Sequence, residues 1–372
     1  MKNIKLLDST LREGAQSPGV SYTSKERLEI ATALDEFEID FIELGHPAVS
    51  DSVFEGVREV SSQNLDASLL AHSRATKEDI DLVIESGVEW IGIFLCVSER
   101  ALKNRFEISL DEALQKIERS ITYAKDHGLK VRFTPEDTIR TEWDNLFRTL
   151  SRAKDAGANR FSVADTTGSA YPFDFYQIVT DFLDYSIPTN VHCHDDMGLA
   201  LTNAIMGVEA GATLVDASVN GIGERSGIVD LAQIAVTLKY HYDIDAYNLH
   251  KLNELSEMIQ NITGLKVQEN QPIVGENAFV HNSGLHVSAV IEDPNTYEFM
   301  PAEDLGRKRE VHLDMYSGKD SVKHYLEKKG IKADDKTVKK ILASLKSSSG
   351  QFDLKKLISK REIKEEKYVD NS

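Results

Sequence analysis

The sequence is poor in cysteine, in long apolar runs and in positive charge. Its two cysteines, Cys96 and Cys193, are too few for a disulfide framework, and the first residues do not resemble a secretory signal peptide. No apolar run approaches the length that a membrane span requires. These absences lead us to expect a cytoplasmic protein with reduced thiols and no membrane partner.

The shortage of positive charge limits the choice of ligand. The chain has 43 lysines and arginines against 61 aspartates and glutamates, a formal net charge of −18. General binding to nucleic acid requires a basic surface, so this balance argues against a nucleic-acid partner. A small anionic ligand remains compatible with it, because a local arginine cluster can override the net field.

Short apolar runs alternate with amphipathic stretches through the first two-thirds of the chain. Eight runs are expected to form strands, at residues 4–8, 39–44, 67–71, 90–95, 130–133, 160–164, 189–192 and 213–218. Six stretches between them have helical spacing, at residues 25–37, 77–86, 111–127, 141–156, 172–183 and 198–210. Several of these helical stretches are followed by glycine, which commonly ends a helix.

This alternation predicts the architecture. Strand–helix alternation implies a parallel sheet, and eight units imply a closed (β/α)8 TIM barrel. A doubly wound open sheet is the alternative, but its glycine-rich phosphate turn is missing from residues 8–14. We expect a barrel domain at 1–255, closed by a helix near 231–242, and a small, mainly helical C-terminal region at 256–372. Within that region, residues 275–290 are expected to form a loop and residues 321–329 and 336–346 to form helices.

Polar side chains cluster after the predicted strands, where a barrel of this kind has its active site. They are Asp8, Arg12, Glu13, Gln16, Glu43, His46, His72, Arg74, Glu136, Asp137, Asp165, Thr166, His192, His194, Asn220, Glu224 and Arg225. The opposite strand ends carry mostly Gly, Asp, Ala and Asn, as simple connections do. The sequence therefore predicts one active site at the carboxyl ends of the strands.

A metal site is expected at the end of the seventh strand. Side chains two residues apart on a strand share a face, so His192 and His194 can bind one divalent ion together. Glu13 is the best candidate for a carboxylate ligand and Asn220 for a weaker oxygen ligand, with other positions left open. An isolated His-x-His is usually two ordinary histidines, and the neighbouring polar groups favour a metal here. For Asp195–Asp196 we expect ligand orientation or helix capping.

Arg12 is costly to bury beside Glu13 without a purpose. It could hold a carboxylate or stabilise a developing oxyanion, or it could form a structural salt bridge with Asp8 or Glu13. Glu43 is equally compatible with a functional role and with pairing to a base inside the barrel. Thr166 could donate to a substrate carboxylate or cap a helix.

Three motifs resemble the homocitrate synthase and isopropylmalate synthase family of metal-dependent acyltransferases: residues 11–16, 192–196 and 220–225. Ser283–His286 followed by Tyr297 is similar to that family as well, and the resemblance covers about residues 5–329. It implies a barrel whose small C-terminal region lends residues to the partner subunit of a homodimer. It also implies a Claisen condensation of amino-acid biosynthesis, in which acetyl-CoA adds to a 2-oxo acid and CoA is released.

The resemblance further implies a role for individual residues. The ligands of a divalent metal (Zn, Mn or Mg) would be Glu13, His192, His194 and, in the isopropylmalate branch, Asn220. Arg12 would polarise the keto oxygen, and Gln16, His72 and Thr166 would join it in binding the 2-oxo acid. Proton transfer around the acetyl group would fall to Glu136, His286 and Tyr297.

The chain departs from the family pattern at two places. Arg27 stands where the family usually has lysine, and we expect it on a helix surface. In members that use 2-oxoglutarate, a His after the third strand and an Arg after the fourth receive the distal carboxylate. Residues 73–76 contain no His, and the arginines within residues 97–105 do not stand at the position that the Arg has in those members. Possible substitutes are Arg74, Arg100, Lys103 and Arg105.

Homocitrate synthesis is the favoured activity, and isopropylmalate or citramalate synthesis from a smaller or branched 2-oxo acid is the alternative. The absence of a domain as large as the leucine-sensing module of many isopropylmalate synthases favours the former. A related lyase would need a cysteine in residues 221–227, which have none. An aldolase would leave His286 unexplained, and a non-catalytic metal-binding barrel would not need Arg12.

Overall fold

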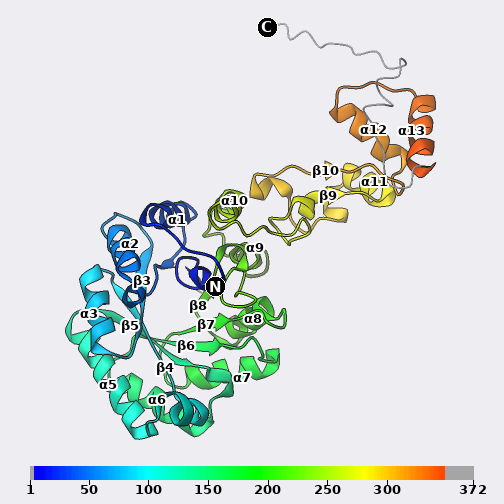
Figure 1. Cartoon of the computed structure of the whole chain (residues 1–372). Coiled ribbons are helices and arrows are strands. Elements are labelled where there is room, and N and C mark those ends of the chain that lie inside the picture. The colour runs from blue at the N-terminus through cyan, green and yellow to red at the C-terminus, as the bar shows by residue number, and fades with distance from the viewer. Residues whose placement is uncertain (1–3, 348–372) are drawn as a thin grey trace. The chain divides into compact units, whose positions relative to one another are not determined.

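The computed structural model describes residues 4–347, which form two compact units divided between Val267 and Gln268 (Figure 1). The first unit extends beyond the predicted boundary at residue 255. Helix α10 (Leu252–Thr263) belongs to it because this helix packs against α1 (Ser24–Glu36). In the described part of the chain, no helix has the length and apolarity needed to cross a membrane.

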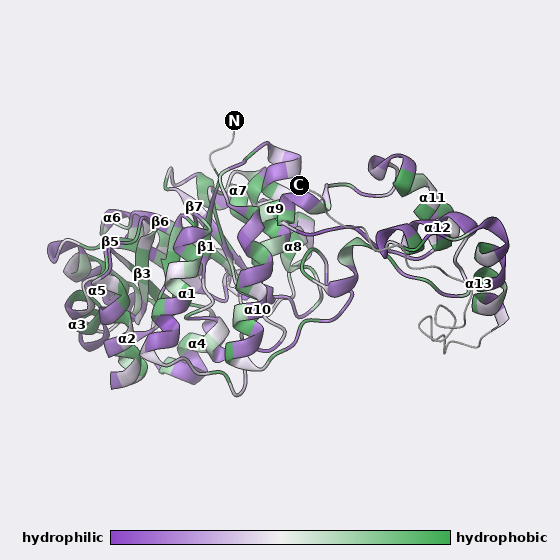
Figure 2. Cartoon of the chain, turned by 90° about the horizontal axis from the view of Figure 1, so that it is seen from above, coloured by the Kyte–Doolittle hydropathy of each residue, from purple (hydrophilic) through white to green (hydrophobic). Residues whose placement is uncertain are grey.

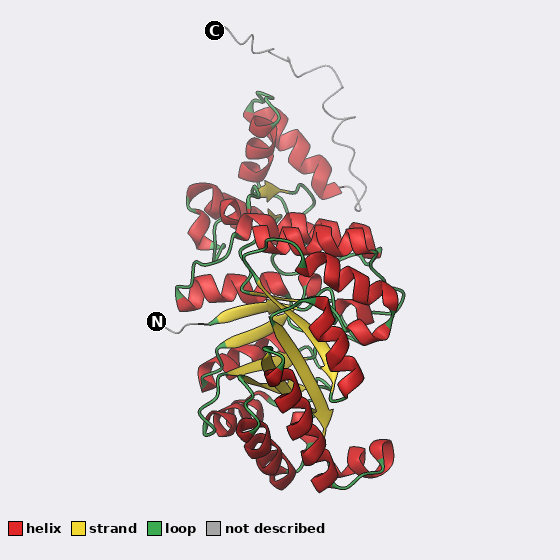
Figure 3. Cartoon of the chain, turned by 90° about the vertical axis from the view of Figure 1, so that its left-hand side faces the viewer, coloured by secondary structure: helices red, strands yellow, loops and turns green. Residues whose placement is uncertain are grey.

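The first unit is the predicted closed barrel of eight parallel strands. Its strands are β1 (Lys5–Asp8), β2 (Phe41–Glu43), β3 (Ser68–Arg74), β4 (Trp90–Cys96), β5 (Lys130–Glu136), β6 (Arg160–Asp165), β7 (Thr189–Cys193) and β8 (Leu214–Ala217). The ring closes where β1 pairs with β8, in the register Lys5 to Leu214. Figure 3 shows the yellow strands enclosed by red helices.

Helices surround the barrel and cover its strands. They are α1, α2 (Asp51–Ser61), α3 (Lys77–Ser86), α5 (Leu110–Asp126), α6 (Trp143–Asp155), α7 (Pro172–Leu183), α8 (Ala200–Ala210) and α9 (Leu231–Tyr242). Purple and green segments alternate along them in Figure 2, as expected of helices with one buried face. Because the helices cover the outside and side chains fill the inside, every residue of β7 and β8 is buried.

Arg27 contradicts the expectation of a surface position. It lies on the inner face of α1 with only 3% of its surface exposed. Its Nη1 donates to the carbonyl oxygens of Leu11 and Leu44, at 3.1 and 2.9 Å. Gly56 of α2 makes room for it, since a Cβ there would lie 2.6 Å from Arg27 Cδ. The surface prediction was wrong because these carbonyl groups lie far from Arg27 in sequence.

The second unit is small and mainly helical, as predicted. It contains α11 (Gly284–Glu292), α12 (Lys319–Lys328), α13 (Asp335–Ser347) and a short parallel pair, β9 (Val280–His281) and β10 (Glu310–Val311). The expectation of a loop at 275–290 was partly wrong, because α11 begins within it. A small apolar cluster holds α12 and α13 together: Leu313, Val322, Leu326, Val338, Ile341 and Leu345.

Candidate active site and metal centre

A cavity of about 410 Å³ opens at the carboxyl ends of the barrel strands. All eight strands, or the loops that follow them, contribute to its wall. Its polar and aromatic lining residues include Arg12, Glu13, Gln16, His46, His72, Phe94, Arg132, Glu136, Thr166, His192, His194, Asp216 and Arg225. The barrel therefore brings together side chains that are up to about 200 residues apart in sequence, as its topology requires.

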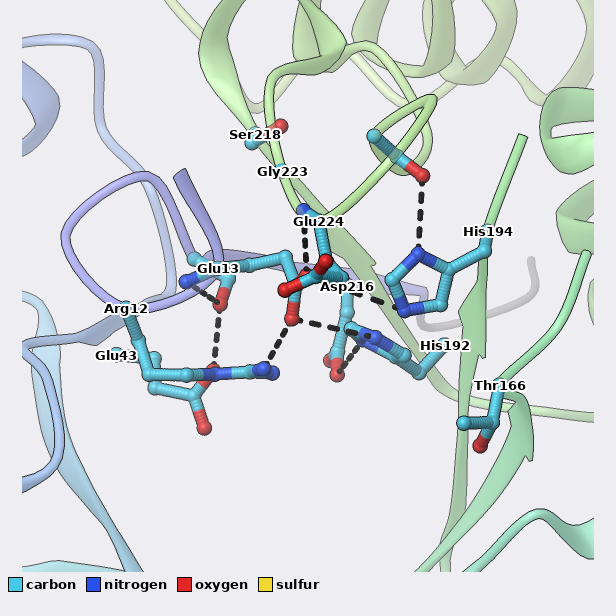
Figure 4. A network of polar contacts seen from close by, with 12 residues as sticks. Arg12, Glu13, Glu43, Thr166, His192, His194, Asp216, Ser218, Gly223 and Glu224 are labelled. Carbon is cyan, nitrogen blue, oxygen red and sulfur yellow. Dashed lines mark hydrogen bonds and ion pairs between the residues drawn. The ribbon is translucent and has the colours of Figure 1, made fainter. Parts of the chain in front are cut away.

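Glu13, His192 and His194 face one another at one side of this cavity (Figure 4). One ligand atom from each lies within 4.8 Å of the others, and all three residues are buried. The Nε2 atom of His192 is 3.8 Å from Glu13 Oε2, and that of His194 is 3.9 Å from Glu13 Oε1. Two imidazoles and one carboxylate converging in this way are a suitable donor set for a divalent cation with open coordination positions.

The Nδ1 atom of each histidine already makes a hydrogen bond. His192 Nδ1 donates to Asp216 Oδ2, and His194 Nδ1 donates to the carbonyl oxygen of Gly227, both at 3.1 Å. Since these oxygens can only accept, the hydrogen of each neutral ring lies on Nδ1 and the lone pair of Nε2 faces Glu13. Histidine ligands of metals are oriented by such contacts, so the donor set fits a bound cation.

The protonation states suit metal binding as well. Burial, with a further contribution from His192, lowers the pKa of His194 to about 4, so its imidazole is neutral at pH 7. Burial opposes the ionisation of Glu13, but Arg12 and the two histidines outweigh it and lower the pKa of Glu13 to about 2. A neutral imidazole and an ionised carboxylate are the forms that bind metals.

Arg12 and Glu43 belong to a charge network that extends from this cluster into the barrel. Arg12 contacts Glu13 through Nη1 and donates from Nε to Glu43 Oε2 at 2.7 Å. Burial disfavours its charge, yet Glu43 and Glu13 raise the pKa of Arg12. Glu43 is fully buried and also accepts from Arg132 at 2.6 Å and from His72 at 3.1 Å. Glu43 is therefore an interior residue paired with bases, one of its two predicted interpretations.

Arg132 was missed by the sequence analysis. It lies in β5, is only 2% exposed, and contacts both Glu43 and Asp216, the latter at 3.3 Å. Its Nε has no hydrogen-bond partner in the described part of the chain. The available signal was an arginine inside a strand that a covered barrel must bury, because such residues are almost never buried unpaired.

The proposed substitutes for a distal carboxylate receptor do not line the cavity. Arg74 forms a two-point ion pair with Asp79, and Arg105 pairs with Glu136. Neither Arg100 nor Lys103 is in the cavity wall. His72, by contrast, is in the wall as a residue of β3, which continues to Arg74 and so extends past its predicted end at residue 71.

His72 and His46 both line the cavity, and each contacts an acidic residue. His72 stacks on Phe94 with 4.6 Å between ring centroids. Burial, with a further contribution from Arg12, lowers the pKa of His72 to about 4. His46 Nε2 lies 2.8 Å from Asp79 Oδ2. His46 was expected at a strand end, with no role assigned to it.

The other predicted residues are placed as follows. Gln16, Thr166 and Glu136 line the cavity, and the Thr166 hydroxyl accepts the N–H of Asp137 at 2.9 Å. Asp195 accepts the N–H of Ala200 and so caps α8. Asp196 does not cap this helix but pairs with Arg225 at 2.7 Å.

The side-chain amide of Asn220 contacts the helix that follows the barrel. Its side-chain Nδ2 donates to the carbonyl oxygen of Ser256 in α10 at 3.1 Å, and it is not part of the cavity wall. The amide is therefore used to hold α10 against the loop after β8. The assignment of Asn220 as a fourth ligand has no support in this geometry.

His286 and Tyr297 lie in the second unit, where they form a pair. Their rings stack with 3.9 Å between centroids and 24° between planes. Tyr297 is 49% exposed, and its neighbours Leu285 and Phe299 are 80% and 66% exposed. The two predicted catalytic residues of this region therefore share one exposed, partly aromatic surface.

Comparison with known proteins gives consistent results along the chain. Residues 3–259 match the HMGL-like family model, and residues 273–352 match the homocitrate synthase post-HMGL domain-like model. The homocitrate synthase of Pyrococcus abyssi is 59% identical, over 97% of this chain and 100% of that protein. The homocitrate synthase of Pyrococcus horikoshii is 58% identical, over 95% and 98%. One of Saccharolobus islandicus is 43% identical, over 94% and 77%.

Solved structures show the same barrel at low sequence identity. A Bacillus subtilis HMG-CoA lyase aligns with a TM-score of 0.65 and 19% identity, over 72% of this chain and 96% of its own. A hydroxymethylglutaryl-CoA lyase of Pseudomonas aeruginosa gives 0.64 and 18%, over 74% and 97%. At such identities the likeness concerns the fold alone.

Proposed function

The chain belongs to the homocitrate synthase family of HMGL-like barrel enzymes, and from this we propose that it condenses acetyl-CoA with 2-oxoglutarate to give homocitrate and CoA. The observation that carries the proposal is one cavity in which a metal-binding donor set adjoins two arginines. Glu13, His192 and His194 supply the donors, and Arg12 and Arg132 supply the positive charge. A 2-oxo dicarboxylate needs both features, because it presents a chelating 2-oxo acid group and a second carboxylate.

The metal-binding side would hold the reacting end of the 2-oxo acid. A divalent ion bound by Glu13, His192 and His194 would supply Lewis-acid polarisation of the ketone. Arg12 is positioned to donate a hydrogen bond as negative charge develops on the keto oxygen. The hydroxyl of Thr166, also in the cavity wall, is available for the neighbouring carboxylate.

The distal carboxylate would meet His72 and Arg132. Among residues 4–347, nothing accepts a hydrogen bond from the buried Nε–H of Arg132, and an acceptor brought by the substrate would suit it. A carboxylate arriving near His72 would favour the protonated imidazole, since a nearby negative charge stabilises the cationic form. A branched apolar 2-oxo acid would leave these groups without a new partner, so the geometry favours 2-oxoglutarate over the isopropylmalate-type alternative.

The acetyl-CoA side needs a base, because the methyl group is a weak carbon acid. Glu136, at the end of β5 and in the cavity wall, is suited to take a methyl proton. The resulting carbanion attacks the keto carbon, and water then cleaves the thioester to release CoA. We assign the remaining proton transfers to His286 and Tyr297, supplied by the partner subunit of a cytoplasmic homodimer.

A lyase acting in the reverse direction is disfavoured by the cysteines. Both Cys96 and Cys193 are buried, in β4 and β7, and the loop of residues 221–227 contains none. Burial also raises the pKa of the Cys193 thiol well above its usual range. Neither thiol is therefore suited to act as an acid or base in the cavity.

A substrate comparison tests the proposed function directly. With acetyl-CoA present, we expect kcat/KM for 2-oxoglutarate to exceed that for 2-oxoisovalerate, pyruvate and oxaloacetate by at least about 100-fold, because a buried polar site left unpaired discriminates strongly. Thiol release measured with a chromogenic disulfide gives the rates. A higher kcat/KM for 2-oxoisovalerate would instead assign the chain to the isopropylmalate type.

Metal dependence is a second expectation. Dialysis against a chelator should abolish CoA release, and adding back Zn²⁺, Mn²⁺ or Mg²⁺ one at a time should restore it and identify the preferred ion. Far-ultraviolet circular dichroism before and after dialysis controls for unfolding. Unchanged turnover in demonstrably metal-free protein would rule out the proposed centre.

A further inference from the structure

We propose that Arg105 is the positioning residue for Glu136, an inference that rests on the proposed function and deepens it. Arg105 Nη1 lies 3.0 Å from both Oε1 and Oε2 of Glu136. In the described part of the chain, the Glu136 carboxylate has no other hydrogen-bond partner. A single guanidinium thus determines where the carboxylate of the proposed base lies at the edge of the cavity.

The fold delivers Arg105 to this place through an unusual turn. After β4, Ser98 caps a short helical segment by accepting the N–H of Ala101. The chain then widens into one π-helical turn, Leu102–Phe106, closed by the N–H of Glu107 on the carbonyl of Leu102. Such turns are rare and often occur at functional sites. Here the turn places Arg105 across from the end of β5, the next strand in the barrel.

The turn is held in place at both ends. Leu102 is buried and anchors its start. At its end Glu107 adopts a left-handed backbone conformation, φ 54°, which costs energy for a residue with a side chain. The N–H of Glu99 donates to Glu142 Oε2 at 2.9 Å and ties this loop to the loop after β5. Retention of this unfavourable backbone conformation is consistent with selection for the position that the turn gives to Arg105.

A purely structural role for the ion pair is disfavoured by its exposure. The Arg105 side chain is 55% exposed, so its removal creates neither a cavity nor an unpaired buried charge. Exposed ion pairs contribute little to stability, with a median of about 0–1 kcal/mol. The expected consequence of losing Arg105 is therefore a Glu136 carboxylate that no hydrogen bond from the described residues holds at the edge of the cavity.

The kinetic consequences are specific. Arg105→Ala should lower kcat by about 10- to 100-fold, part of the contribution of a general base, while KM for 2-oxoglutarate changes by less than about threefold. A lower kcat with a nearly unchanged KM separates a misplaced base from weakened substrate binding. Arg105→Lys should restore part of kcat, because it returns a cation that can donate a hydrogen bond to the carboxylate.

Matched controls come from the same loop. Arg100 and Lys103 are cations with no ion pair to Glu136, so Arg100→Ala and Lys103→Ala remove the same charge and should leave kcat and KM unchanged. The second control is Glu136→Gln. If Arg105 acts through this carboxylate, adding Arg105→Ala to Glu136→Gln should cause no further loss of kcat.

The experiment uses the full chain with its metal and measures CoA release over a range of 2-oxoglutarate concentrations. The proposal is overturned if Arg105→Ala behaves like Lys103→Ala, or if it lowers kcat equally with and without Glu136→Gln. Failure of the proposed function would look different, since the wild-type chain would then release no CoA from acetyl-CoA and 2-oxoglutarate. In that case the positioning role falls with it.

Discussion

Glu13→Gln is expected to lower kcat by at least about 10³-fold while leaving the barrel folded. The substitution replaces the one carboxylate among the three proposed ligands with a neutral amide of the same shape. The Lewis acid that depends on it contributes several kcal/mol to such reactions, and about 4 kcal/mol corresponds to about 10³ in rate. The amide oxygen can still accept the N–H of Glu224, as Glu13 Oε1 does at 3.0 Å.

The measurement combines kinetics with metal content. Metal bound per chain, determined by elemental analysis after gel filtration, should fall together with kcat in Glu13→Gln and also in His194→Ala. Glu55→Gln is the matched control, since Glu55 pairs with Arg58 on the exposed side of α2, and it should retain both. A Glu13→Gln protein that keeps its metal and turns over normally would refute the proposed centre.

The fold could be predicted because its cause is local. Eight apolar runs separated by amphipathic stretches leave few arrangements other than a parallel barrel, and glycine positions such as Gly87, which adopts a left-handed conformation after α3, mark the helix ends. The prediction ended β3 and β5 three residues early, at residues 71 and 133. The missing residues include His72 and Glu136. Strand ends that line a site are polar, and so they break the apolar pattern that reveals strands.

The candidate site could be predicted only where its residues are near one another in sequence or follow a recognisable motif. Side-chain alternation along one strand was enough to pair His192 with His194. The environment of Arg132 could not be predicted, because Glu43 and Asp216 lie 89 and 84 positions away. The contact of Asn220 could not be predicted for the same reason, since its partner Ser256 is on a helix beyond the barrel strands. The partners of these buried charges come together only when the barrel closes.

Those buried charges lead to the largest expected effect on stability. Glu43→Gln should lower the free energy of unfolding by about 3–5 kcal/mol, the usual cost of removing one partner from a buried ion pair. Glu43 is fully buried, and its carboxylate lies between Arg12, at 2.7 Å, and Arg132, at 2.6 Å. A neutral amide would leave both guanidinium groups, which are largely buried, with less counter-charge.

The charge origin of this effect can be separated from a packing origin. The double variant Glu43→Leu/Arg132→Met removes the acid and one base together, and it should recover part of the stability lost in Glu43→Gln, because an apolar pair of similar volume avoids the uncompensated charge. Glu55→Gln, which breaks an exposed pair, should cost less than about 1 kcal/mol. Unfolding in urea, followed by circular dichroism, compares the three. If Glu43→Gln unfolds at the same urea concentration as Glu55→Gln, the network does not stabilise the barrel, and its arginines would then be retained for substrate alone.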